Sequence, residues 1–193
     1  MQTRITLFFL ISFFSVQLAG ATQFVSPYSG EQLRSIKSLS EQDVHDLTLG
    51  KGWGLAKAAE LNGVPGPLHI LEMQDAIHLN DSQRQEVTRL FDAMKDRASQ
   101  LGKQLVELEA NLNSAFANNT VDKDSLKHML DEIGRVRAEL RYTHLSAHLE
   151  TPSILTPHQI VMYNKLRGYG GNPCDAVPEG HDPTMWKRHN GCE

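Results

Sequence analysis

The chain has 193 residues, of which 40% are hydrophobic and 22% are charged, and its formal net charge is -4. This length suits one domain with a tail, and the acidic balance excludes the basic face that a nucleic-acid-binding protein needs. The charged fraction excludes a polytopic membrane protein. The chain is rich in His, with nine, and poor in Cys, with two.

The first residues have the form of a secretory signal peptide. Arg4 precedes an apolar run over 5–16, and the segment ends in the small residues Ala19-Gly20-Ala21. The run is shorter than the ~20 apolar residues of a membrane-spanning helix, and no Cys follows Ala21. We therefore predict secretion with cleavage after Ala21, and an uncleaved anchor is the alternative.

Glycine and proline positions divide the rest of the chain. Between Pro67 and Pro152 there is no proline and there are only two glycines, whereas both are frequent before and after. This pattern predicts a lead-in over 22–65, a helical domain over 66–168 and a tail over 169–193. Short helices are expected at 31–38, 40–49, 54–61 and 68–77.

The strongest periodic signal lies in the centre of the chain. Apolar residues from Val87 to Ala115 recur at alternating steps of four and three, which predicts a long helix with a heptad seam. A polar break at 118–120 precedes a second long helix, expected from about 122 to 149. Its inner face would contain Leu126, Leu130, Ile133, Val136 and Leu140.

These elements predict an all-α fold. Two long helices joined by a short polar loop form an antiparallel hairpin, with the shorter helices at its flanks. A last helix is expected from Thr156 to about 168. No segment shows the alternation of a strand.

Two five-residue segments have the same form, one before the first long helix and one before the last helix. In each, a capping residue preceded by leucine is followed three positions later by glutamine, as in a capping box. By themselves these residues predict helix starts and no chemistry. The segments contain Leu79, Asn80, Gln83, Leu155, Thr156 and Gln159.

This pair resembles the LTxxQ motif of the Spy/CpxP family of periplasmic proteins, which includes zinc-resistance-associated proteins and heavy-metal sensors. The second segment matches the motif fully, and the first has Asn80 in place of Thr. The resemblance covers about 66–168 and the signal peptide. It implies a four-helix protein, a periplasmic location, a cradle-like homodimer and a role in envelope stress. That role could be metal binding, partnership with a membrane sensor, or ATP-independent chaperoning of unfolded clients.

A metal site is predicted at the open end of the hairpin. His144 and His148 are four residues apart on the second long helix, so both imidazoles share one face. Hairpin geometry sets them opposite 92–96, which holds Asp92, Met94 and Asp96, and the helix at 68–77 folds back to the same level. The predicted ligands are His69, Met73, His144, His148 and Asp92.

This ligand set is similar to the His, Glu and Met ligands of the family's metal sensors. Imidazole alone does not choose between Zn, Cu, Ni and Co. In the alternative interpretation, His144 is a core residue and His148 a surface residue.

The tail has Cys and His residues of its own. In an oxidising compartment a disulfide between Cys174 and Cys192 is the expected state. One alternative is a zinc site formed by these cysteines with His181 and His189, although the spacing matches no standard pattern. Another is a Cu(I) site built from Met185, Trp186 and a His.

The sequence gives no support for an enzyme, because it lacks a serine elbow, an HExxH motif, a CxxC pair and a Rossmann fingerprint. The leading hypothesis is a periplasmic stress protein that binds or senses a transition metal through clustered His. The alternative is a chaperone or sensor-kinase partner that works without metal.

Overall fold

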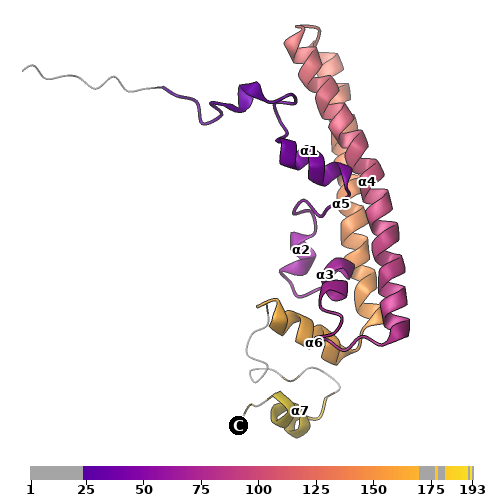
Figure 1. Ribbon diagram of the computed structural model, residues 1–193. Coiled ribbons are helices and arrows are strands. Elements are labelled where there is room, and N and C mark those ends of the chain that lie inside the picture. Colours follow the sequence, from indigo (N-terminus) through magenta and orange to yellow (C-terminus); the bar gives the residue numbers. More distant parts are fainter. Residues whose placement is uncertain (1–23, 170–176, 178–180, 191, 193) are drawn as a thin grey trace, which may run out of the picture.

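The computed structural model describes residues 24–169, 177, 181–190 and 192, which form an all-α protein with no strand among them (Figure 1). The predicted fold class is therefore confirmed, and the predicted signal peptide over 1–21 lies outside these residues. In this part of the chain, no helix combines the length and the hydropathy needed to cross a bilayer. The helices are η1 (Glu31–Leu33), α1 (Glu41–Thr48), α2 (Lys57–Glu60), α3 (Pro67–Glu72), α4 (Asp81–Ala117), α5 (Lys123–Ile154), α6 (Pro157–Leu166) and α7 (Pro183–Asn190).

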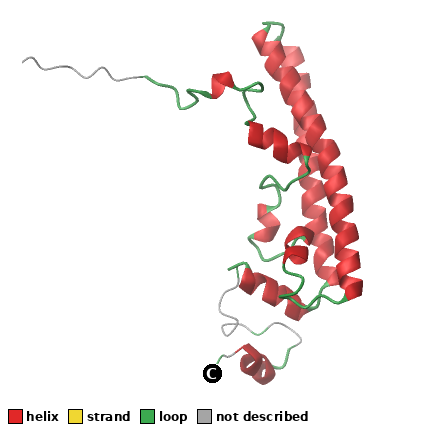
Figure 2. Cartoon of the chain, in the orientation of Figure 1, coloured by secondary structure: helices red, strands yellow, loops and turns green. Residues whose placement is uncertain are grey.

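A hairpin of two long helices forms the body of the molecule (Figure 2). α4 has 37 residues, α5 has 32, and they run antiparallel. Asn80 caps the first and Asp122 caps the second, each in a capping box. The predicted hairpin is confirmed, but α5 continues past Pro152 to Ile154. Pro152 has no backbone N–H to donate, but Thr151 beside it is fully buried and its hydroxyl donates to the carbonyl of Ala147 over 2.7 Å.

Three of the shorter helices, α1, α2 and α3, cover one face of the hairpin (Figure 1). α1, α2 and α3 follow it from its middle toward its open end, where α6 lies. α1 packs against α4, and α3 packs against both long helices. Gly102 permits the close approach of α1, because a Cβ at that position would overlap the carbonyl oxygen of Leu47.

Two clusters of buried side chains hold these elements together. The middle core joins α1 to the centre of the hairpin and contains Leu39, Leu47, Leu55, Ala98, Leu101, Leu105, Ile133, Val136 and Leu140. The open-end core joins α3 and α6 to the ends of the long helices and contains Ile70, Ile77, Leu79, Val87, Leu155 and Tyr163. The part of the hairpin between them, at the level of His144, belongs to neither cluster.

Three local predictions differ from the structure. Leu130 is 49% exposed, because it lies toward the hairpin tip, beyond the helices that cover the core. Only η1 forms within 31–38, since the amide of Asn113 bonds the backbone of this segment at Lys37 and Ser35. α3 ends at Glu72, and the chain turns before 80 through His78, which has a left-handed φ of 56°.

Candidate metal-binding pocket

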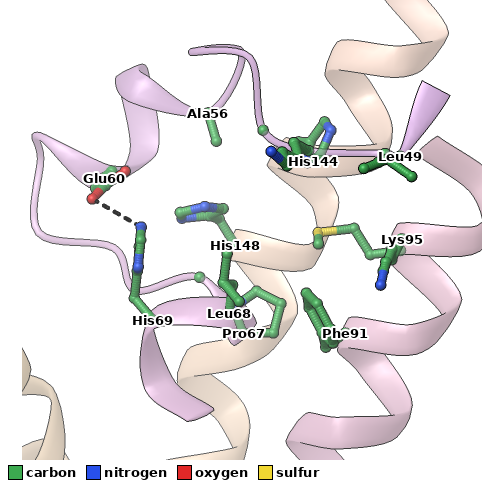
Figure 3. Close-up of a pocket in the computed structure, with 15 residues that line it drawn as sticks. Leu49, Ala56, Glu60, Pro67, Leu68, His69, Phe91, Lys95, His144 and His148 are labelled. Carbon is green, nitrogen blue, oxygen red and sulfur yellow. Dashed lines mark ion pairs between the residues drawn. The ribbon is translucent and has the colours of Figure 1, made fainter. Parts of the chain in front are cut away.

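A pocket of about 420 Å³ opens where the short helices meet the hairpin, between the two cores (Figure 3). α4 contributes Phe91, Met94 and Lys95 to its wall, and α5 contributes His144 and His148. The segment from the end of α1 to α3 closes the remaining side. Side chains that are far apart in the sequence therefore surround one cavity.

The two imidazoles reach this pocket because they continue the apolar stripe of α5. Val136 and Leu140 are buried in the middle core, and His144 and His148 follow on the same face at intervals of four residues. His144 is 3% exposed and His148 is 7% exposed. The expectation of a surface position for His148 does not hold, because the segment before α3 covers its ring.

His148 is held in one tautomer by a backbone carbonyl. Its Nδ1 lies 2.8 Å from the oxygen of Val64, and because a carbonyl only accepts, Nδ1 must donate. The lone pair of the neutral ring is then on Nε2. A Cβ built at Gly66 would overlap Nε2 and lie 2.6 Å from Cε1 and 3.0 Å from Cδ2. These similar distances place Gly66 over the ring face, so Gly66 does not block the lone-pair direction of Nε2.

His144 has a buried nitrogen that nothing in the described chain satisfies. Its Nε2 is inaccessible to solvent and has no hydrogen-bond partner among the described residues. Burial, and to a lesser extent the charge of a protonated His148 nearby, lower the pKa of His144 to about 4. The ring is therefore neutral at physiological pH. A buried polar atom without a partner is rare, and a bound ion is one of its ordinary explanations.

His69 lines the pocket but is engaged elsewhere. Its Nδ1 lies 2.8 Å from Glu72 Oε2, and its Nε2 lies 3.5 Å from Glu60 Oε1 (dashed line in Figure 3). To bind a metal, His69 would have to give up one of these carboxylates.

Glu60 is held in turn by an ion pair with Arg167 and by the hydroxyl of Tyr169, which donates over 2.8 Å. Burial alone would raise the pKa of Glu60, but the hydrogen bonds from Tyr169 and Arg167 outweigh it and lower that pKa. This carboxylate is thus ionised and already has its donors.

The remaining residues of the predicted ligand set lie outside the pocket. Met73 packs against the open-end core, and the side chain of Asp92 is exposed on α4. Met94 instead lines the cavity. The heptad pattern contained this distinction, since position 94 is on the seam and position 92 is not. Within the described residues, no three His, Cys, Asp or Glu side chains are grouped so that they could hold a metal ion.

The pocket nevertheless fits a metal in part. Two imidazoles on one helix face line a largely apolar cavity, and the Nδ1 bond to Val64 is the outer contact that commonly orients a metal-binding His. A complete site needs a further donor, either a thioether or a carboxylate released from its present partners.

Below the pocket, the two LTxxQ-type segments join each other. Both capping boxes are formed, at Asn80 and at Thr156. The glutamines of the two boxes exchange hydrogen bonds: Gln83 Nε2 donates to Gln159 Oε1 over 2.9 Å, and Gln159 Nε2 donates to Gln83 Oε1 over 3.0 Å. The amide of Gln83 also donates to the carbonyl of Ile154, at the end of α5. The motif thus fastens the starts of α4 and α6 to the end of α5, beyond a role in capping.

In the tail, the predicted cysteine pairing involves Cys174, which lies outside the described residues. α7 was not predicted, and it carries Trp186, whose ring meets that of His181 edge-on at 4.9 Å between centroids. The disulfide between Cys174 and Cys192 and the alternative tail metal sites remain predictions.

The comparison with protein families decides what kind of protein this architecture represents. Residues 57–162 match the family of heavy-metal resistance proteins. The chain belongs to this heavy-metal resistance family. The family is a member of the Spy/CpxP-like helical superfamily, so the resemblance carried by the LTxxQ-type segments is confirmed. Its proteins act in resistance and binding rather than in catalysis. No curated protein and no solved structure gives a significant match.

Proposed function

We propose that this heavy-metal resistance protein acts in the periplasm and binds a transition metal between α5 and the segment that precedes α3. The observation that carries the proposal is the buried Nε2 of His144, which has no partner among the described residues. It lies on the same helix face as His148, whose Nδ1 donates to Val64 so that its Nε2 can coordinate. Neutral imidazole is the commonest protein ligand of such metals. Family membership and the fit of the two rings both support it.

The position of the pocket suggests how binding would be signalled. Its walls come from the hairpin on one side and from the segment between α1 and α3 on the other. A metal held here would stabilise the closed arrangement of these parts, because a ligand favours the conformation that binds it. A membrane sensor or a second copy of the chain could then recognise this closed form.

The proposal is tested by calorimetric titration of the purified protein with Zn²⁺, Cu²⁺, Ni²⁺ and Co²⁺. We expect at least one of these metals to bind with micromolar affinity or better, and the double substitution His144→Ala/His148→Ala to abolish that binding. His128→Ala is the matched control, because His128 lies on the same helix with its side chain 77% exposed. Full binding by the double variant, or binding of no metal by the wild type, would refute the proposal.

An ATP-independent chaperone is the second candidate. Tyr142 and Leu149 on α5 are 72% and 75% exposed, and Tyr142 borders a groove between the long helices that also contains Leu90 and Ala147. Accessible apolar surface of this kind is what client binding requires. A chaperone would suppress aggregation of a model client equally with and without metal, and Tyr142→Ser with Leu149→Ser should weaken that suppression.

A further inference from the structure

The charges around the pocket bear on which metal it suits. Two lysines line it, Lys51 and Lys95, and among the described residues only the first has a carboxylate partner, Asp46, at 2.8 Å. The ammonium of Lys95 lies 5.8 Å from the centroid of the Phe91 ring. The single carboxylate of the lining, Glu60, is committed to Arg167 and Tyr169. Among the described residues of the lining, no free anionic group therefore remains to offset the charge of a bound cation.

A neutral and largely apolar site discriminates strongly by ionic charge. The Born free energy of transferring an ion from water into a low-dielectric site grows with the square of the ionic charge. It is therefore about four times larger for a dication than for a monocation of equal size. Zinc sites commonly recover this cost with thiolates or carboxylates. In this pocket the two imidazoles supply no negative charge, and the ammonium of Lys95 adds to this cost.

The donor atoms that remain are soft as well as neutral. Met94 lies on the α4 seam at the level of the two His and lines the same cavity. Its thioether is a soft ligand and therefore a good one for Cu(I). With the ring nitrogens of His144 and His148 it would form a three-coordinate set of two nitrogens and one sulfur, which needs no His, Cys, Asp or Glu beyond these two.

We infer that the pocket selects a soft monovalent cation, Cu(I) or its analogue Ag(I), through His144, His148 and Met94. This inference rests on the proposed function and narrows it. Met94 replaces Met73 and Asp92 of the sequence-based ligand set, and His69 keeps its contacts with Glu60 and Glu72.

The test uses Ag(I), supplied as nitrate without chloride, and Zn²⁺, with Cu(I) measured by competition with a chromogenic chelator under anaerobic reducing conditions. Met94→Leu removes the sulfur while keeping the shape of the side chain. Met73→Leu is the matched control, because Met73 packs in the open-end core rather than in the pocket. The methyl resonance of each methionine reports independently on whether its sulfur meets the ion.

We expect one equivalent of Ag(I) to bind at least about tenfold more tightly than Zn²⁺, with a shift of the Met94 methyl resonance. Met94→Leu should weaken the binding of Ag(I) and of Cu(I) by more than about tenfold. Removal of a residue that only orients a metal ligand already lowers affinity by about this factor, and removal of a direct ligand should lower it at least as much. Met73→Leu should leave both affinities unchanged.

Zn²⁺ binding at His144 and His148 that is tighter than Ag(I) binding would overturn the inference and leave the proposed function standing. An effect of Met73→Leu with none of Met94→Leu would also overturn it. If the double variant His144→Ala/His148→Ala still binds Ag(I) and Zn²⁺ as the wild type does, both the inference and the proposed function are refuted.

Discussion

At the scale of single residues, the central feature is a histidine kept neutral by its surroundings. The side chain of His144 is buried on the inner face of α5, and its Nε2 has no partner among the described residues. Burial removes the water that would stabilise the charged ring, which is why its pKa falls to about 4. Protons therefore compete little with a metal for this nitrogen. When no metal is bound, the buried nitrogen lacks a hydrogen bond, which lowers the stability of the fold.

The lowered pKa of His144 predicts a loss of stability in acid. In the unfolded chain a His has a pKa of about 6.5, and in the folded protein that of His144 is about 4, so the unfolded state binds the proton more tightly between these values. The metal-free protein should therefore lose up to about 3 kcal/mol from this group as the pH falls from 6.5 to 4, with no contribution above 6.5. Urea unfolding at several pH values would measure it.

The variant His144→Gln isolates this contribution from those of other titrating groups. Its free energy of unfolding should depend less steeply on pH between 4 and 6.5 than that of the wild type. His128→Gln, at an exposed position on the same helix, should keep the wild-type slope. Equal slopes for all three proteins would show that His144 is not held neutral.

A second prediction concerns the glycine above His148. In Gly66→Ala the new methyl group would overlap the imidazole, so the ring or the segment before α3 must move. We expect a loss of about 1–3 kcal/mol in the free energy of unfolding and weaker metal binding. Gly134→Ala is the control, because a Cβ there meets nothing and lies within α5, where alanine should stabilise by about 1 kcal/mol. Thermal melts and metal titrations of both variants would compare them.

At the scale of elements, the LTxxQ-type segments act as a clasp. Each glutamine completes a capping box and also pairs with the other, so Gln83 and Gln159 tie α4, α5 and α6 together. Sequence reasoning found the caps because a cap depends on neighbours within one turn. The exchange of hydrogen bonds joins residues 76 positions apart, and no local pattern contains that information.

The clasp predicts coupling between the two glutamines. Gln83→Ala and Gln159→Ala should each cost about 1–3 kcal/mol, since each removes a cap contact and leaves the other amide unpaired. The double variant should cost less than the sum of the two, with a coupling energy of about 0.5–3 kcal/mol. Denaturant unfolding of the four proteins measures this term, and the exposed Gln85→Ala should change little. Strict additivity would contradict the clasp.

The difference between local patterns and long-range contacts also explains which other features of the fold and of the site could be predicted from the sequence. Heptad spacing set the long helices, and i, i+4 spacing put His144 and His148 on one face, because both depend on helix periodicity alone. The placement of Met73 and Asp92 required knowing where α3 ends and how it packs. α3 ends at Glu72, and Met73, the residue that follows it, packs against the open-end core.

At the scale of the whole molecule, the pocket lies at the seam between the hairpin and the segment that covers it. Residues 57–162, which match the heavy-metal resistance family, contain most of the pocket wall, including both imidazoles. The lining residues 49–52 and Ala56 lie before this range. A metal bound at this seam would link the two parts. In this account metal binding and closure of the protein are one equilibrium.

This linkage predicts that metal stabilises the fold as a whole. At a free metal concentration about one hundred times Kd, the free energy of unfolding should rise by about 2.7 kcal/mol, provided that the unfolded chain binds the metal weakly. The rise should vanish in His144→Ala/His148→Ala and persist in His128→Ala. Thermal unfolding across a metal titration would show whether the melting temperature depends on metal concentration as this relation requires.

The most direct test of the central claim is long-range ¹H–¹⁵N correlation spectroscopy of the imidazoles during titration with metal. The account predicts that the Nε2 resonances of His144 and His148 shift together at one equivalent, whereas the protonated Nδ1 of His148 keeps its hydrogen bond to Val64. The resonances of the exposed His128 should not move. Metal binding that leaves both Nε2 resonances unchanged would contradict the account.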